Sequence, residues 1–173
     1  MLEHICCSHL HRHIDTNNIL CEGNHGFRAK HSTETQLLVT SHDLLKHIDQ
    51  GKQVDVLILD FSKAFDTVPH RHLLGKLEYY GVHDNLLRWC ESFLVGRFQS
   101  VLVDGVKSAE ESVLSRVPQG TVLGPLKFLL YINDLPSRVN IDTRCRLFAD
   151  DCLLYRIIDG FEDHVQLQSD LRE

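Results

Sequence analysis

The chain has 173 residues, which suits one domain or slightly more. Hydrophobic residues make up 43% of it, enough for a packed core, and no apolar run reaches the roughly 18 residues that a membrane-spanning helix needs. The polar, histidine-rich start lacks the apolar segment of a secretory signal. We therefore expect a soluble intracellular protein that does not enter a membrane.

The charge and the cysteines restrict the class of protein further. A formal charge of -6 at pH 7 is unexpected for a nucleic-acid binder, which normally draws affinity from a basic face. Carboxylates that hold metal ions count as negative in this sum, and this softens the objection. The six cysteines form no C-x-x-C pair, so we expect free thiols.

The first half of the chain predicts three helices and a strand. The helices are expected over residues 33–48, 69–80 and 84–95, and a buried strand rich in branched residues over 54–59. Thr33 and Gln36 form a predicted capping box for the first helix, which Gly51 closes. Residues 1–32 carry no clear pattern.

The second half predicts mainly strands. Two strands, 99–103 and 112–117, flank the turn signal Asp104-Gly105, and a helix is expected over 123–135. Residues 145–149 and 152–157 predict a β-hairpin with Asp150-Asp151 at its bend, followed by a helix over 162–173. Strands and helices alternate irregularly, which indicates an α+β or α/β class.

A carboxylate stands at the end of the predicted apolar strand, in the segment Leu59-Asp-Phe-Ser-Lys-Ala-Phe-Asp66. Burying an ionised aspartate costs several kcal/mol unless it is paired or binds a metal. Asp60 is therefore either a cap for the following turn or a metal ligand.

Two adjacent carboxylates interrupt the apolar hairpin at Phe148-Ala-Asp-Asp151. Aspartate is common in turns, but this one lacks the glycine that most two-residue turns use. Like charges side by side disfavour each other's ionised form, and a divalent cation resolves that conflict. Between the two acidic segments, the loop Pro118-Gln-Gly-Thr-Val-Leu-Gly-Pro125 has glycines that let its backbone approach another molecule.

Taken in order, these segments resemble the motifs of reverse transcriptases from non-LTR retrotransposons, in particular the jockey-like LINE enzymes. Asp60 begins a segment similar to motif A, Pro118-Gln119-Gly120 resembles motif B, and Phe148-Ala-Asp-Asp151 is a form of the aromatic-x-Asp-Asp box of motif C. Asn24-His-Gly-Phe-Arg-Ala-Lys-His-Ser-Thr33 and Tyr131-Ile-Asn-Asp-Leu135 are similar to further phrases of that group.

The resemblance implies a right-hand polymerase palm, in which a small antiparallel sheet packs on helices. It predicts a partial fingers segment over residues 1–52 and a palm core over 53–173, with a hairpin insertion at 97–117. Asn24 stands where related sequences usually have Gln. The thumb, the primer grip and the upstream endonuclease of the family have no counterpart, so we expect a truncated copy in which processive synthesis is in doubt.

The implied reaction is nucleotidyl transfer. The 3′-hydroxyl of a DNA primer, paired to an RNA template, attacks the α-phosphate of a deoxynucleoside triphosphate (dNTP), and pyrophosphate leaves. Two Mg²⁺ ions (or Mn²⁺) about 3.5–4 Å apart would stabilise the attacking and leaving oxygens. Asp60 and Asp150 would be the bridging ligands, Asp151 the third acidic member, and the backbone carbonyl of Phe61 a further ligand.

The same resemblance assigns nucleotide contacts. Phe65 would pack under the incoming sugar and exclude a 2′-hydroxyl, or it is a core residue. Gln119 and Gly120 would lie beside the incoming nucleotide and the template base. Arg28 would contact a phosphate, or it is a solvated basic residue. Asp66 is expected to be a helix cap or a structural partner.

Three other functions and a zinc site are alternatives to this prediction. The first is a catalytically inactive palm remnant with at most weak nucleic-acid binding. A phosphatase of the haloacid-dehalogenase type would need an aspartate at Ser62, and a nucleotide cyclase would need a Gly-Gly-acidic turn at the hairpin. The histidine-rich start lacks the paired ligand spacing of a zinc site.

Overall fold

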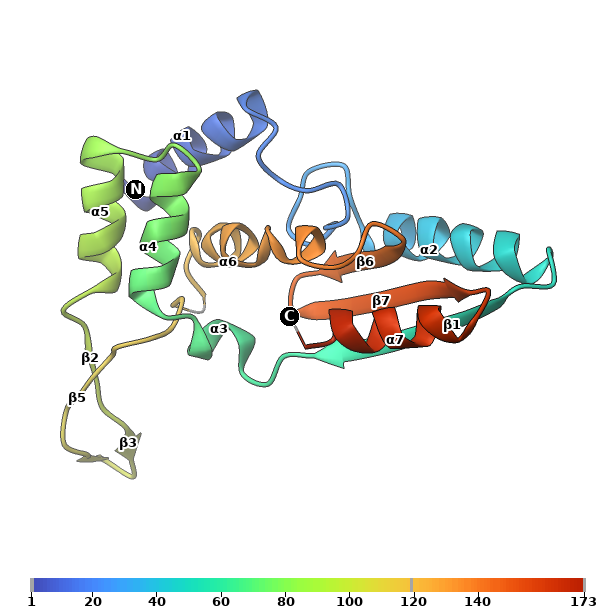
Figure 1. Cartoon of the computed structure of the whole chain (residues 1–173). Coiled ribbons are helices and arrows are strands. Elements are labelled where there is room, and N and C mark those ends of the chain that lie inside the picture. The colour runs from blue at the N-terminus through green and yellow to red at the C-terminus, as the bar shows by residue number, and fades with distance from the viewer. Residues whose placement is uncertain (1, 119, 173) are drawn as a thin grey trace. The chain divides into compact units, whose positions relative to one another are not determined.

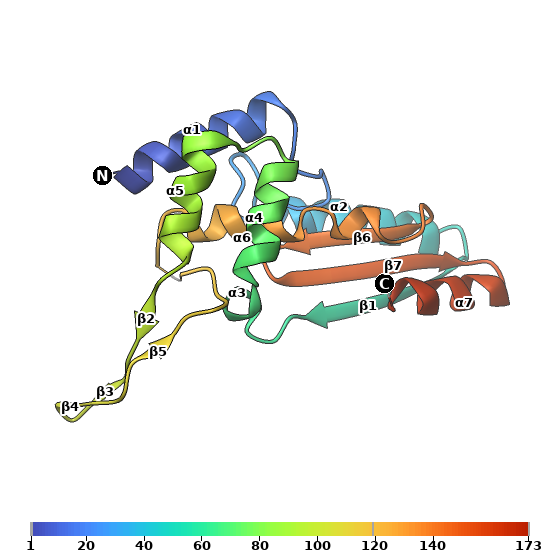
Figure 2. The same ribbon diagram turned by 60° about the vertical axis from the view of Figure 1, so that its left-hand side comes forward.

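The computed structural model describes residues 2–118 and 120–172 and divides the chain into two compact units (Figures 1 and 2). Unit 1 comprises residues 1–19 and 63–131, and unit 2 comprises residues 20–62 and 132–173. Each unit is therefore built from two separate stretches of sequence. The predicted division at residue 53 follows a different line and stays a prediction.

A three-stranded antiparallel sheet forms the centre of unit 2. Its order is β1 (Gln53–Asp60), β7 (Asp151–Ile158), β6 (Thr143–Phe148). Side chains alternate between the two faces of a sheet. Helix α2 (Thr33–Ile48) bonds to Arg146 and Tyr155 on one face, and α7 (Phe161–Asp170) bonds to Arg156 on the other (Figure 1). The short 3-10 helix η1 (Leu135–Ser137) precedes β6.

Strand β1 is confirmed, but it is not buried on both faces as predicted. It lies at the edge of the sheet and pairs only with β7. The side chains of Val56 and Ile58 are 42% and 81% exposed. The branched apolar run that suggested a buried strand therefore leaves one face open within the described residues.

The residue that caps the N-terminus of helix α2 lies one position earlier than predicted. Ser32 is the N-cap, and its side chain and that of Thr35 accept hydrogen bonds from each other's backbone N–H. The predicted pair of Thr33 and Gln36 was wrong, because Ser32 and Thr33 are adjacent cap candidates and the hydroxyl of Thr35 takes the place of the Glu or Gln that a capping box usually has.

Unit 1 is helical. Its helices are α1 (Leu2–Thr16), α3 (Ala64–Thr67), α4 (His70–Tyr79), α5 (Asp84–Leu94) and α6 (Gly124–Ile132). Helix α1 was not predicted, although the helix buries Cys7, Leu10 and Ile14 on one face. The carboxylate of Glu3 in α1 accepts a hydrogen bond from Leu123 N at the start of α6. The expected helices 69–80, 84–95 and 123–135 are confirmed with shifted ends.

A narrow β-ribbon leaves α5 and returns before α6 (Figure 2). Strand β2 (Phe98–Gln99) pairs with β5 (Glu111–Ser112), and β3 (Leu102–Val103) pairs with β4 (Val106–Lys107). The turn at Asp104-Gly105 is confirmed, with φ angles of 49° and 81°. This combination of positive φ angles is typical of a type I′ hairpin turn. The predicted first strand, 99–103, is divided into β2 and β3. The predicted second strand, 112–117, is wrong beyond Ser112, because the returning strands β4 and β5 lie at residues 106–107 and 111–112.

Two further expectations concern the chain as a whole. Within the described residues, no helix combines the length and apolar character needed to cross a bilayer. All six cysteines are free thiols, as predicted.

Candidate active site

The two acidic segments meet on adjacent strands of unit 2. Asp60, the last residue of β1, is the direct cross-strand partner of Asp151, the first residue of β7. Directly opposed residues place their side chains on the same face of a sheet, with β-carbons about 4.5–5.5 Å apart. Asp150 precedes Asp151 in the hairpin turn. Asp60 and Asp151, ninety-one positions apart in sequence, thus lie side by side, while the predicted sharing of one cation by Asp60 and Asp150 stays a prediction.

The hairpin bend lies one residue earlier than predicted. Phe148 pairs with Asp151, so the two turn residues are Ala149 and Asp150. Ala149 has φ of 55°, in the left-handed region that glycine normally occupies. A positive φ at the first turn position and a negative one at the second is typical of a type II′ turn. Asp151 is consequently a strand residue, which fixes it opposite Asp60.

The three carboxylates have no competing partners within the described part of the chain. No hydrogen bond or ion pair there involves the side chain of Asp60, Asp150 or Asp151. No three His, Cys, Asp or Glu side chains between residues 2 and 172, Gln119 aside, gather closely enough to form a metal cluster by themselves. The donor set, with only carboxylate oxygens and the adjacent carbonyl of Phe61, has the chemistry that Mg²⁺ prefers. The predicted ligands therefore match a hard divalent cation in their chemistry, while their gathering around one ion stays a prediction.

The hairpin is held by a loop from the Asn24–Thr33 segment. Asn24 forms a parallel bridge with Leu147 of β6, where His25 N donates to Leu147 O (3.0 Å) and Leu147 N donates to Gly23 O (2.8 Å). The loop thereby pairs with β6 through one isolated bridge. A β-carbon on Gly26 would lie 2.2 Å from Ala149 N. Glycine at position 26 is therefore required by the close approach of the loop to the acidic turn.

Arg28 stabilises this same loop. Its Nη1 donates hydrogen bonds to Cys21 O at 2.7 Å and to Asn24 O at 3.0 Å. One end of the guanidinium group is thus used to hold the backbone that supports the hairpin. The predicted contact between Arg28 and a phosphate stays a prediction, and it would have to use the remaining nitrogens.

Phe65 lies in unit 1, where it stacks on Phe128 of α6 with ring centroids 4.2 Å apart and planes 22° apart. Its backbone carbonyl accepts a hydrogen bond from Val117 N (2.8 Å). Pro69 and Ser115 form an antiparallel bridge beside it. The end of motif A is therefore joined directly to the segment that leads into the Pro-Gln-Gly loop.

The loop itself is tightly folded. Gly120 has φ of 75°, and a β-carbon on Gly124 would lie 2.8 Å from Pro118 O. Thr121 Oγ1 donates to Pro118 O (2.7 Å) and accepts from Gly124 N (3.1 Å). Both glycines are thus needed for the backbone path. The predicted contact of Gln119 lies outside the described residues.

Asp66 is a structural partner, one of its two expected roles. Its Oδ1 lies 3.0 Å from Nε of Arg116, an ion pair whose angle does not make a hydrogen bond. Its carbonyl oxygen accepts a hydrogen bond from Ser115 Oγ (2.9 Å). The contact gives no support to a role as metal ligand.

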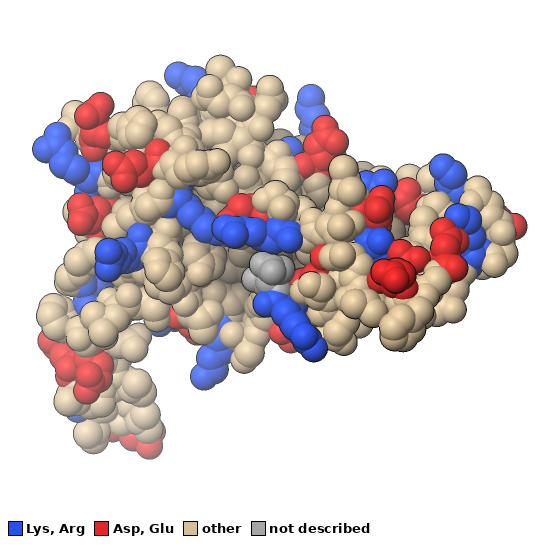
Figure 3. All heavy atoms as spheres, viewed as in Figure 1, with Lys and Arg blue, Asp and Glu red and all other residues tan. Residues whose placement is uncertain are grey.

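Figure 3 shows the charges on one face of the chain. Over the part of unit 2 that is visible there, acidic and basic side chains are interspersed. The interspersed charges agree with the sequence, whose negative net charge comes from a mixture of acidic and basic residues.

Comparison with known proteins decides the family. The model of the family "Reverse transcriptase (RNA-dependent DNA polymerase)" matches residues 1–173. This chain belongs to the reverse transcriptase family. A probable RNA-directed DNA polymerase from the transposon X-element of Drosophila melanogaster is 34% identical over 166 residues, covering 87% of this chain and 18% of that protein. The polymerase of the mobile element jockey of Drosophila funebris is 30% identical, covering 80% of this chain and 15% of its own.

The resemblance to non-LTR retrotransposon reverse transcriptases is thus confirmed. The Pol polyprotein of an R2 element of Popillia japonica is 27% identical and is covered over 22% of its length. This reverse transcriptase chain therefore spans less than a quarter of these curated relatives. Members of the family generally depend on divalent metal ions.

Solved structures confirm the fold. A telomerase from Candida albicans matches with a TM-score of 0.67 at 14% identity, over 99% of this chain and 32% of that one. A telomerase from Candida tropicalis matches with a TM-score of 0.63 at 12% identity, over 99% and 36%. The mixed helical and antiparallel architecture is that of a partial polymerase palm and fingers, as predicted.

Proposed function

We propose that this chain is the core of an RNA-directed DNA polymerase that adds dNTPs to the 3′-end of a DNA primer on an RNA template. The observation that carries the proposal is the pairing of Asp60 with Asp151, next to Asp150 in the turn. Strands β1 and β7 carry Asp60 and Asp151, the turn between β6 and β7 carries Asp150, and no hydrogen bond or ion pair in the described chain neutralises these carboxylates. Family membership supports the reaction class.

Asp60, Asp150 and Asp151 would hold two Mg²⁺ ions, with the carbonyl of Phe61 as a further ligand. Bound Mg²⁺ supplies charge stabilisation for the attacking and leaving oxygens of an in-line displacement. The chain's own contribution is to fix the carboxylates. The β1–β7 register sets Asp60 against Asp151, and the loop around Gly26 restrains the turn that carries Asp150.

Phe65 and the motif B loop would position the incoming nucleotide. Phe65 is a bulky ring that also stacks on Phe128, and its size supports a role in excluding a ribose 2′-hydroxyl. Gly120, with its positive φ, offers backbone without a side chain. Gln119 is assigned to the nucleotide by motif resemblance.

Primer extension tests the proposal. The full 173-residue chain is given an RNA template, a labelled DNA primer, dNTPs and Mg²⁺, and the product is resolved on a gel. We expect Mg²⁺-dependent extension by at least one nucleotide that Asp150→Asn abolishes and that Asp49→Asn, an exposed carboxylate at the end of α2, leaves intact. Extension that survives Asp150→Asn would contradict the proposal. Binding of template without any extension would favour the inactive palm remnant.

A further inference from the structure

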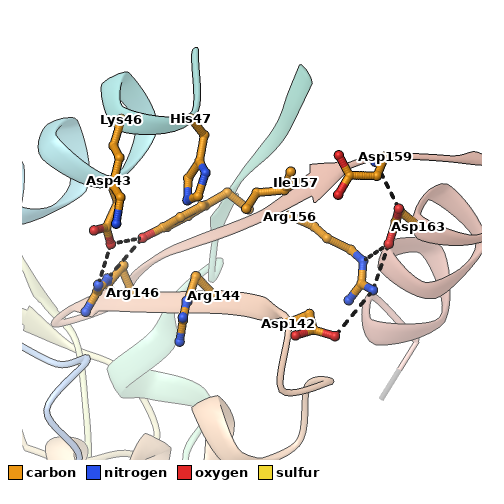
Figure 4. Close-up of a pocket in the computed structure, with 11 residues that line it drawn as sticks. Asp43, Lys46, His47, Asp142, Arg144, Arg146, Arg156, Ile157, Asp159 and Asp163 are labelled. Atoms are coloured by element: carbon orange, nitrogen blue, oxygen red, sulfur yellow. Dashed lines mark hydrogen bonds and ion pairs between the residues drawn. The ribbon is translucent and has the colours of Figure 1, made fainter. Parts of the chain in front are cut away.

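Unit 2 contains a polar groove of about 700 Å³ at some distance from the acidic turn. Helix α2 lines one side, and strands β6 and β7 with the segments around α7 line the rest (Figure 4). Its lining residues are Asp43, Lys46, His47, Asp142, Arg144, Arg146, Tyr155, Arg156, Ile157, Asp159 and Asp163. By composition four carboxylates face four basic side chains, so the groove is neutral at first sight.

The carboxylates, however, are all committed to partners. Asp43 accepts hydrogen bonds from Tyr155 Oη (2.7 Å) and Arg146 Nη2 (2.8 Å). Asp163 accepts from Nε and Nη2 of Arg156 (3.0 and 2.9 Å) and from the backbone N–H groups of Asp159 and Gly160.

The remaining two acids are also engaged. Asp159 pairs with Lys52 at 3.3 Å, and Asp142 lies 3.9 Å from Arg156. Each carboxylate of the groove thus already lies against a basic side chain, and Asp142 and Asp163 share Arg156.

Two cations of the groove have no such partner. Among the described residues, neither Arg144 nor Lys46 forms a hydrogen bond or an ion pair. The Nδ1 atom of His47 is also buried without a partner. Lys46 and His47 descend from α2 toward the sheet, and Arg144 extends from β6 beside Arg146 (Figure 4). The uncommitted groups are therefore cationic or neutral donors, which leaves the groove short of negative charge.

The pKa of Asp43 indicates the same positive potential in the groove. Burial opposes its charged form, but hydrogen bonds from Tyr155 and Arg146 and the charges of Arg146 and Arg144 outweigh it, so that the pKa of Asp43 falls below its usual value. Arg144 therefore adds positive potential inside the groove beyond the Arg146 that already pairs with Asp43.

We propose that this groove binds phosphate groups of a nucleic-acid strand through Arg144 and Lys46. Guanidinium and ammonium groups are the side chains that contact phosphate oxygens most often. Arg144 and Arg146 are two residues apart on an extended strand, about 7 Å along it. The inference rests on the proposed function, since a polymerase core must hold a template or primer. It places a phosphate contact at Arg144, four residues or about 13 Å along the strand before β6 ends at Phe148.

Fluorescence anisotropy tests the groove without requiring catalysis. A labelled 12-nucleotide single-stranded RNA is titrated with the full chain in EDTA, so that the acidic residues bind no metal. Arg144→Gln and Lys46→Gln should each raise the Kd about threefold to tenfold and lower the slope of log K against log salt by about 1. Arg144→Lys, which keeps the charge, should recover part of the affinity.

A matched control removes the same charge elsewhere in unit 2. Arg138 is 64% exposed and pairs with Asp134, so Arg138→Gln should change the Kd less than twofold. An equal loss for Arg138→Gln would overturn the inference, because net charge alone would then explain it. If the wild type binds RNA and the Arg144→Gln variant binds equally well, the inference about the groove is wrong, while the proposed function stands. If the wild type does not bind, both fail.

Two further measurements identify the ligand. Phenylglyoxal labelling followed by mass spectrometry should show Arg144 protected by RNA and Arg138 unprotected. Competition with inorganic phosphate should require a far higher concentration than competition with unlabelled RNA. If inorganic phosphate competes as well as RNA does at the same phosphate concentration, the groove is a site for free phosphate. The assignment to a nucleic-acid strand would then be wrong.

Discussion

Gly26 lies so close to Ala149 that a β-carbon on it would be 2.2 Å from Ala149 N and 3.0 Å from Ala149 Cα. These are backbone atoms of the turn that carries Asp150, so they cannot rotate away as a side chain would. The glycine of the Asn24–Thr33 segment thus has a structural reason that can be tested directly.

Gly26→Ala should destabilise the chain by about 2–3 kcal/mol, because the loop or the hairpin must shift to admit the methyl group. Urea denaturation followed by circular dichroism measures this. Gly75→Ala is the control: no atom lies within 4 Å of its β-carbon position in α4, and alanine should stabilise a helix by about 0.5–1 kcal/mol there. Equal effects at both sites would contradict the packing argument.

Asp43 links α2 to the strands of the acidic hairpin, and its replacement should lower the stability mainly at neutral pH. Asp43→Asn leaves the charge of Arg146 without its carboxylate and should cost about 1–2 kcal/mol. The pKa of Asp43 is lowered from 3.8, so its stabilising contribution is present above that value and is lost as the pH falls through the folded-state pKa.

The difference in urea midpoint between wild type and Asp43→Asn should therefore be largest near pH 7 and shrink below pH 3.8. Tyr155→Phe removes the other donor to Asp43 but leaves the ion pair, and should cost less. A difference that does not depend on pH would mean that the charge of Asp43 is unimportant.

Much of the site was predictable because its signals are local. An apolar run ending at Asp60 and a second one interrupted by Asp150 and Asp151 indicated two strands with acidic ends. The motif order then indicated that these ends meet. The one-residue error in the bend arose because Ala149 adopts φ of 55°, which a sequence without glycine at that position does not announce.

The features that were not predicted depend on contacts between residues far apart in the sequence. The groove joins Asp43 to Tyr155, 112 positions apart, and no local pattern shows that pairing. Helix α1 had a usable signal, since Cys7, Leu10 and Ile14 recur at helical spacing, but alternating histidines obscured it. The exposed face of β1 was unpredictable because the run of branched residues is the same whether one face or two are covered.

Phe65 should control the choice of sugar. Replacing it with valine removes the bulk that would exclude a 2′-hydroxyl, so Phe65→Val should raise the ratio of kcat/KM for ribonucleotides over deoxynucleotides by about tenfold or more. Single-nucleotide incorporation with each triphosphate gives this ratio. Phe128→Leu separates stacking from selection, because it removes the partner ring 4.2 Å away but keeps Phe65. It should lower the melting temperature and leave the ratio nearly unchanged.

Lys127 carries a buried charge in unit 1 that should weaken the fold at neutral pH. Its side chain is 0% exposed, and Nζ lies 4.1 Å from the ring centroid of Phe93 without a hydrogen-bond partner in the described chain. Burial lowers the pKa of Lys127 from 10.5 to about 8. The ammonium–ring contact offsets only part of the desolvation.

The sign of the effect follows from proton binding. Between pH 8 and 10.5 the unfolded chain holds a proton on Lys127 that the folded chain has released, so stability rises with pH across that window. Below pH 8 both states are charged and the full cost applies, about 3 kcal/mol for a shift of this size. Lys127→Met should therefore stabilise the chain at pH 7, and its advantage over the wild type should shrink toward pH 10.5. Urea melts at pH 7 and pH 10 measure the stabilisation and its decrease with pH. Lys107, whose side chain is 57% exposed, provides the control: Lys107→Met should show neither effect. A destabilised Lys127→Met would mean that the ammonium has a stabilising partner in the folded protein.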